Sequence, residues 1–197
     1  MMRRHGLTAV AAACLLAACG GGGSDDNARG ALKETPQTVA TLTAAQLDTS
    51  TAASGLQALS GKARCDVRVV ALNYATVGVA GEATNASGVM LVPGGTCTGP
   101  FPLVAYAKGT DVQKPRTLAN PADSETGLLM AMYAAQGYAV VATDYLGFAK
   151  SGYSYHPYLH ADSEATSIID AIRAARGAAS MQGIGLSGKV MLTGYSQ

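Results

Sequence analysis

The four residues from Gly194 to Gln197 read Gly-Tyr-Ser-Gln, which is the beginning of a Gly-x-Ser-x-Gly nucleophile elbow. A serine hydroxyl becomes an effective nucleophile when a tight strand-to-helix turn exposes it and a nearby base accepts its proton. Small residues on either side of the serine make that turn possible. Ser196 is therefore the candidate nucleophile.

The Gly-x-Ser triplet also occurs at Ser24, Ser154 and Ser187, so the triplet alone carries little information. Only Ser196 follows a short apolar run, residues 189–193. Such a run is typical of a buried parallel strand that delivers its end directly into the turn. An ordinary strand-ending turn is the alternative, because the pattern stops before its final glycine. We expect this chain to be the N-terminal part of a longer protein.

The first residues have the pattern of a bacterial lipoprotein signal. Basic residues at positions 3–5 precede an apolar stretch, residues 7–18, that is too short to span a bilayer. Residues 16–19 read Leu-Ala-Ala-Cys and match a lipobox, which predicts a signal peptide over residues 1–18 and a lipid on Cys19. A plain signal peptide with an incidental cysteine is the alternative. We expect export and lipid anchoring to the bacterial cell envelope, with the outer membrane as the expected location, or secretion.

Residues 19–61 are rich in Ala, Thr, Ser, Gln and Gly and contain few large apolar side chains. This composition predicts a low-complexity, lipid-anchored tether. A weak amphipathic helix over residues 43–59 would place Leu47, Leu56 and Leu59 on a neighbouring surface. The folded domain is expected to occupy residues 62–197.

The net charge of +1, with no Lys/Arg cluster beyond the signal, gives no indication of nucleic-acid binding. The same balance argues against a partner held by electrostatic attraction. A small uncharged substrate fits this composition better.

Two cysteines, Cys65 and Cys97, remain once Cys19 and the signal are set aside. An oxidising compartment favours a disulfide between them. Residues 67–77 and 83–92 read as a hairpin, and a centre near Gly81 would place opposite each other residues whose numbers sum to about 162. Positions 65 and 97 satisfy that relation. Two free thiols, or a metal site without a nearby histidine pair, are the alternatives.

The order of elements after the hairpin predicts an α/β domain with a parallel sheet entered through an antiparallel hairpin. Strands are expected at residues 101–107 and 138–143, ahead of the strand that leads to Ser196. A helix is expected at residues 125–136, ending at Gly137 in a left-handed cap.

A second helix is expected to begin at a cap formed by Asp162 or Ser163. Its apolar stripe would contain Ala165, Ile168, Ile169, Ile172 and Ala175, whereas Glu164, Asp170, Arg173 and Arg176 would mostly face water. Asp144 ends the strand before this helix, at the edge where open parallel sheets bind ligands. A structural or a substrate-side role is open for it.

This order, together with residues 194–197, resembles the first half of an α/β-hydrolase, and more closely the secreted bacterial lipase and esterase branch related to fungal lipase A enzymes. The stretches that carry the likeness are residues 105–110, 137–145 (GYAVVATDY), 156–159 and 169–176 (IDAIRAAR). The likeness extends from about Cys65 to Gln197. It implies a carboxylic-ester hydrolase with a serine nucleophile, an acyl-enzyme intermediate, and neither cofactor nor metal.

The resemblance also implies an oxyanion hole formed by the amide of Gln197 and an amide just after the third strand, at Thr110 or Asp111. Two backbone N–H groups aimed at a developing oxyanion stabilise the transition state by about 3 kcal/mol each. The family commonly has His-Gly-Thr where this chain has Lys108 at the first position. That departure leaves the identity of the donor open.

The order of the triad in the resembled family is serine, then acid, then histidine, which implies that both partners of Ser196 lie beyond residue 197. His156 and His160 precede the serine and are expected to be structural or to lie at the pocket edge.

The expected partners are thus a small-molecule or lipid ester and the membrane through the anchor, without nucleic acid. A serine peptidase or acyltransferase on the same fold, or a surface lipoprotein that binds a ligand without turnover, are the alternatives.

Overall fold

The computed structural model describes residues 27–197. The predicted signal peptide and Cys19 lie outside these residues. The elements, in chain order, are β1 (Gln37–Leu42), α1 (Ala44–Ser54), α2 (Gln57–Ser60), β2 (Asp66–Val77), β3 (Ala83–Gly94), β4 (Phe101–Ala107), α3 (Ser124–Met132), the 3-10 helix η1 (Ala134–Gln136), β5 (Ala139–Thr143), α4 (Ala161–Met181) and β6 (Leu186–Gly194).

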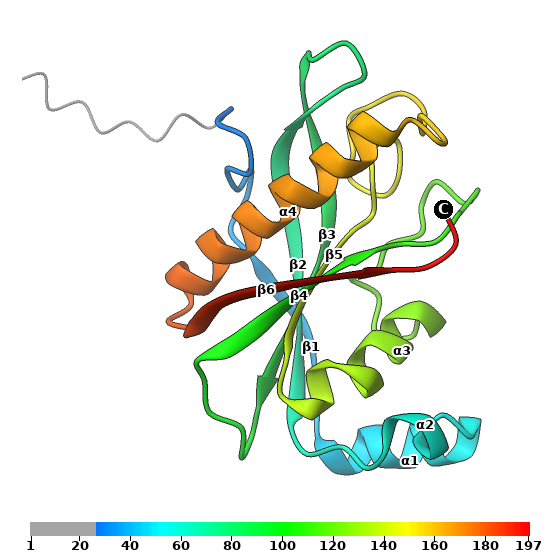
Figure 1. The fold of residues 1–197 in the computed structure, drawn as a ribbon, viewed down its shortest axis with the longest axis vertical. Helices are drawn as coiled ribbons and strands as arrows, with labels where there is room; N and C mark the ends of the chain where they lie inside the picture. The colour runs from blue at the N-terminus through cyan, green and yellow to red at the C-terminus, as the bar shows by residue number, and fades with distance from the viewer. Residues whose placement is uncertain (1–26) are drawn as a thin grey trace, which may run out of the picture.

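One six-stranded sheet, in the order β1-β2-β3-β5-β4-β6, forms the centre of the domain. The first three strands and β5 pair antiparallel in turn, and β4 pairs parallel with both β5 and β6. This is the predicted α/β arrangement with a parallel region entered through a hairpin. Helix α4 covers one face of the sheet, and α3, α1 and α2 lie on the other (Figure 1).

The alternation of buried side chains in the hairpin explains the two cores. Val70, Leu72 and Tyr74 of β2 point to the α4 face, whereas Val67 and Val69 point to the α3 face. Burial of each such side chain contributes about 1.5–3 kcal/mol of hydrophobic free energy.

The register of the hairpin differs from the prediction. The ladder joins Val77 to Ala83 and Asp66 to Gly94, so that paired residue numbers sum to 160. Cys65 and Cys97 nevertheless form the predicted disulfide, with Cα atoms 5.4 Å apart. Beyond β3 the chain turns at Gly95 (φ 65°), and this turn moves the second cysteine back toward the first.

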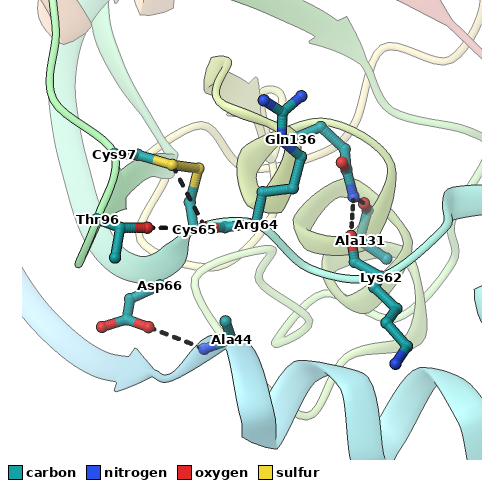
Figure 2. The surroundings of a disulfide bond; sticks show 9 residues. All are labelled: Ala44, Lys62, Arg64, Cys65, Asp66, Thr96, Cys97, Ala131 and Gln136. Carbon is teal, nitrogen blue, oxygen red and sulfur yellow. Dashed lines mark hydrogen bonds between the residues drawn. A yellow bond between two sulfur atoms is a disulfide. The ribbon is translucent and has the colours of Figure 1, made fainter.

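Hydrogen bonds tie the disulfide to the neighbouring helices (Figure 2). The hydroxyl of Thr96 donates to the carbonyl of Arg64 at 3.1 Å, and the side chain of Gln136 donates to the carbonyl of Lys62 at 3.2 Å. Asp66 accepts a hydrogen bond from the first amide of α1, that of Ala44, at 2.8 Å. The base of the hairpin therefore holds both η1 and the start of α1.

The predicted tether is wrong for the part of it that the structure describes. Residues 37–60 form β1, α1 and α2, and β1 is the outer strand of the sheet next to β2. Thr43 begins α1 in a capping box with Gln46, and Leu47 is 2% exposed in the core. Leu59, which was expected beside Leu47 on the apolar side, is instead 78% exposed.

Helix α4 also differs from the prediction. His160, not Asp162 or Ser163, occupies the N-cap position, and its ring accepts a hydrogen bond from the amide of Ser163. The face on the sheet consists of small residues, and the predicted isoleucine stripe lies at its margin. The buried residues of α4 are Ser163, Ser167, Asp170, Ala171, Ala174, Ala175, Ala178 and Ala179.

Asp170, which was predicted to face water, is fully buried. Its carboxylate accepts hydrogen bonds from Arg29 at 3.0 Å, Thr76 at 2.8 Å and Arg173 at 2.6 Å. The buried charge is stable there because each oxygen has a donor. It fastens the segment that precedes β1 onto α4.

The remaining predicted elements are found close to their expected places. Strand β4 has the predicted bounds, β5 begins one residue later than predicted, and Gly137 adopts the left-handed cap conformation with φ 98°. The helix expected at residues 125–136 divides into α3 and η1. Within residues 27–197, strand β6 pairs with β4, and its Leu192 is 73% exposed.

None of the helices in residues 27–197 combines the length and the apolar character needed to cross a membrane.

We predict that Leu47→Ala lowers the free energy of unfolding by about 2–4 kcal/mol, because Leu47 is buried in the core. If residues 37–60 were a tether, the substitution would have no such effect. Leu59→Ala is the matched control and should change the free energy of unfolding by less than about 0.5 kcal/mol. Urea denaturation of the purified variants, followed by circular dichroism, measures both. Equal midpoints for the two variants would show that α1 does not pack as described.

Candidate active site

The turn after β6 lies at the carboxyl end of the parallel strands, at the labelled C-terminal end of the chain in Figure 1. Ser196 belongs to this turn. Ser196 has φ 55°, in the left-handed region. A residue other than glycine pays about 1–2 kcal/mol for this conformation, and such strain often marks functional sites. The residue is exposed and belongs to no helix. The predicted sharp turn at Ser196 is therefore present.

Two glycines allow the turn to sit close to β4. A Cβ atom on Gly194 would lie 2.8 Å from the Cβ of Ala107, which is closer than side chains approach. A Cβ atom on Gly109 would lie 3.1 Å from the carbonyl oxygen of Tyr195. The amide of Tyr195 donates to the carbonyl of Ala107 at 3.2 Å. The end of β6 and the loop after β4 are thus in direct contact.

The loop after β4 contains Thr110 and Asp111, the two residues that the sequence analysis named as alternative oxyanion-hole donors. The amide of Thr110 donates to the carbonyl of Ser196 at 3.2 Å, and the Thr110 hydroxyl donates to the same oxygen at 3.0 Å. Within the described part of the chain, the amides of Asp111 and Gln197 have no hydrogen-bond acceptor. Both N–H groups are therefore free to donate to a ligand.

Glu125, in the first turn of α3, holds this loop in place. Its carboxylate accepts hydrogen bonds from the hydroxyl of Tyr106 at 2.7 Å, the amide of Gly109 at 3.2 Å and the guanidinium of Arg116 at 2.8 Å. Burial raises the pKa of Tyr106 above its usual range, and the hydrogen bond to Glu125 adds to the rise. The phenol therefore remains a donor at every physiological pH.

Arg116 joins three carboxylates beside the loop. Its guanidinium lies 3.1 Å from Asp111, 2.7 Å from Asp123 and 2.8 Å from Glu125. The hydrogen bonds to Asp123 raise the pKa of Arg116 further above its usual value, although partial burial opposes the rise. Neither Arg116 nor Glu125 was identified from the sequence. Their partners lie up to about 20 positions away, and no local pattern signals such a cluster.

His156 lies next to Gln197. Its Nδ1 is 3.1 Å from the carbonyl oxygen of Leu146, so Nδ1 carries the proton, and Nε2 can accept a hydrogen bond from the side-chain amide of Gln197 at 3.3 Å. The same amide donates to Glu164 at 2.7 Å. Burial lowers the pKa of His156. His156 thus contacts the Gln197 side chain, and His160 has a structural role as the cap of α4.

Ser196 and Tyr195 line two cavities at once. One cavity, of about 490 Å³, extends toward α4 and is lined also by Lys108, Tyr145, Glu164 and Gln197. The other, of about 310 Å³, extends toward α3 past Thr110 and Leu128. The serine hydroxyl therefore has space on both sides. In residues 27–197, no group of three His, Cys, Asp or Glu side chains is arranged to hold a metal ion.

Asp144, at the end of β5, is fully buried and makes structural contacts. Its carboxylate accepts hydrogen bonds from the amide of Leu118 at 2.7 Å, the hydroxyl of Ser87 at 2.7 Å and the hydroxyl of Thr117 at 2.9 Å. Burial raises the pKa of Asp144, and the three donors oppose the rise. Asp144 fastens the loop between β4 and α3 to the sheet.

Residues 116–197 match the model of the secretory lipase family. The rice cell wall degrading esterase LipA from Xanthomonas oryzae superimposes with a TM-score of 0.77 and 43% identity, over 85% of this chain and 42% of that chain. A putative hydrolase from Legionella pneumophila superimposes with a TM-score of 0.74 and 24% identity, over 82% of this chain and 43% of that chain. No curated protein matches the sequence.

The chain spans less than half the length of these two proteins, 42% and 43%.

We predict that Asp144→Ala lowers the free energy of unfolding by about 3–5 kcal/mol, because it leaves three donors without their acceptor. Asp144→Asn is the matched control. Its carbonyl can accept from Leu118 and its amide can donate to the two hydroxyls, so we expect a loss of about 1 kcal/mol. Thermal denaturation measures both variants. Similar losses for Ala and Asn would contradict the hydrogen-bonding role.

Proposed function

We propose that this chain acts as a carboxylic-ester hydrolase with Ser196 as the nucleophile. The premises are its α/β-hydrolase fold and the match of residues 116–197 to the secretory lipase family. The observation that carries the proposal is the left-handed turn at Ser196, at the end of a parallel strand and in contact with the loop after β4 through Thr110. The similarity to an esterase at 43% identity supports it.

In the proposed reaction the Oγ of Ser196 attacks the ester carbonyl carbon and forms a C–O bond. The carbonyl oxygen becomes an oxyanion, which the amides of Gln197 and Asp111 stabilise. The alcohol then leaves, and the acyl group remains on the serine until water attacks it and releases the acid.

The base that accepts the proton of Ser196 is proposed to be a histidine beyond residue 197, as the order of groups in the resembled family implies. His156 is not well placed for this role, because its Nδ1 bonds to Leu146 and its Nε2 faces Gln197.

We predict that Ser196→Ala abolishes hydrolysis of p-nitrophenyl butyrate, with kcat reduced by at least about 10³-fold. The comparison uses the protein expressed from the gene read to its stop codon, and the 197-residue chain, which lacks the histidine proposed beyond residue 197, is expected to be inactive. Ser154→Ala is the matched control, because Ser154 is also exposed and is also preceded by Gly-Tyr. It should retain the activity of the unaltered protein.

A fluorophosphonate probe distinguishes the competing functions. Labelling at Ser196, located by peptide mass spectrometry, together with ester hydrolysis supports the proposal. Labelling with turnover of peptides, or of an added acyl acceptor, would instead indicate a serine peptidase or an acyltransferase. An unlabelled protein would indicate a lipoprotein that binds a ligand without turnover.

The location of the protein is proposed from its first residues together with the secretory lipase match, which suggests secretion. We propose that Cys19 becomes lipidated and anchors the protein in the cell envelope. We predict that Cys19→Ser shifts the protein from the detergent phase to the aqueous phase in Triton X-114 partitioning. Aqueous partitioning of the unaltered protein would contradict the anchor.

A further inference from the structure

Lys108 is a buried cation directly after β4, and it lines one of the two cavities beside Ser196. It is 1% exposed, and its Nζ lies 3.2 Å from Asp111 Oδ2 and 4.1 Å from the centre of the Phe148 ring. Lysine is rarely fully buried, because removing an ammonium group from water is costly unless it is paired. An aliphatic side chain would fill the same space at a lower cost, so the charge itself requires an explanation.

The amide and the carboxylate of Asp111 would have opposite effects on an oxyanion. Its amide has no acceptor among the described residues, and it directly follows Thr110, which hydrogen-bonds to the carbonyl of Ser196. Its carboxylate is only 6% exposed, and it carries a negative charge close to that amide. Burial acts to raise the pKa of Asp111, but the Gln113 amide and the cations nearby lower it overall. The carboxylate is therefore ionised at neutral pH, and uncompensated it would repel a developing oxyanion.

Two cations touch this carboxylate, and they are not equivalent. The guanidinium of Arg116 also pairs with Asp123 and Glu125, and its side chain is 23% exposed, so its charge is shared and partly screened. Lys108 pairs with Asp111 alone. The buried Asp144 is the other carboxylate that Lys108 influences, and three hydrogen-bond donors already satisfy it.

We propose that Lys108 is a positioning residue for the oxyanion hole, whose buried ammonium neutralises the Asp111 carboxylate and fixes Asp111 so that its amide faces the oxyanion. This inference rests on the proposed function. Lys108 acts through Asp111 and does not touch the substrate carbonyl. Its effect is therefore exerted in the transition state, when the negative charge develops, and not on the binding of the neutral ester.

The test is a double-variant cycle on the protein expressed from the gene read to its stop codon. The variants are Lys108→Met, Asp111→Asn and the two combined, with Lys114→Met as the matched control. Lys114 belongs to the same loop, is exposed and donates only to the carbonyl of Ser154. The measurements are kcat and KM for p-nitrophenyl butyrate and the thermal midpoint of each variant.

We expect Lys108→Met to lower kcat by about 10- to 100-fold with KM changed less than about 3-fold, because the Asp111 carboxylate then keeps only the shared and partly screened Arg116 as a partner and opposes the oxyanion. Asp111→Asn keeps the amide and should lower kcat by less than about 5-fold. The combined variant should return to the level of Asp111→Asn, because no charge remains to be neutralised. Lys114→Met should behave as the unaltered protein.

Losses that multiply in the combined variant would overturn the inference, and so would a Lys108→Met protein with lowered thermal midpoint but unchanged kcat. If Lys108→Met does not fold, the combined variant decides alone. Activity equal to that of Asp111→Asn supports the inference, and a further loss of about 10-fold overturns it. If the unaltered protein shows no ester hydrolysis, or if its hydrolysis survives Ser196→Ala, the proposed function itself is overturned. This inference is then overturned with it.

Discussion

The parallel ladder between β4 and β6 brings together both sides of the candidate site, because each strand leads directly into one of them. Beyond Ala107 the chain enters the loop with Lys108 and Asp111, and beyond Gly194 it enters the turn with Ser196. The ladder aligns these two strand ends, with Ala107 paired to Gly194. A side chain on Gly194 would separate them, so the absence of a Cβ there allows the turn at Ser196 to lie against the loop after β4.

Buried carboxylates hold the loops around this ladder. Asp144 fastens the segment at Thr117 and Leu118 to the sheet, Glu125 fastens the loop at Gly109, and Asp170 fastens the segment at Arg29 to α4. Each carboxylate is fully or largely buried and takes hydrogen bonds from parts of the chain far from it in sequence. A loop held in this way can remain irregular without being mobile, which suits a site that needs preorganised amides.

The strands with strong apolar patterns were predictable from the sequence. Strands β4 and β5 are continuous apolar runs, and the cap at Gly137 needed only its position after a helical pattern. Strand β1 was missed, because the side chains of residues 37–42 are small and half polar, and only pairing with β2 makes them a strand. The isoleucine stripe of α4 misled the prediction, because the sheet lies too close for large side chains and selects the alanine face.

Part of the site was likewise predictable. The turn at Ser196 follows from a local motif, whereas the choice of Asp111 over Thr110 as the free amide depends on one contact, between Thr110 and Ser196, that only the folded chain contains. The contacts of Lys108, Arg116 and Glu125 likewise form only in the folded chain, so the sequence did not predict them. The disulfide was predicted correctly from a register that was not correct, because the turn at Gly95 compensates for the shift in the ladder.

The buried alanines of α4 limit which substitutions the helix can accept. Side chains of one methyl group lie between the helix and the sheet, and Ala171, Ala174 and Ala178 are at most 2% exposed. Enlarging any of them would lift the helix as a rigid rod, and Glu164 near its first turn would move with it, away from the side chain of Gln197. Substitutions several helical turns away from the pocket would therefore change the shape of the pocket.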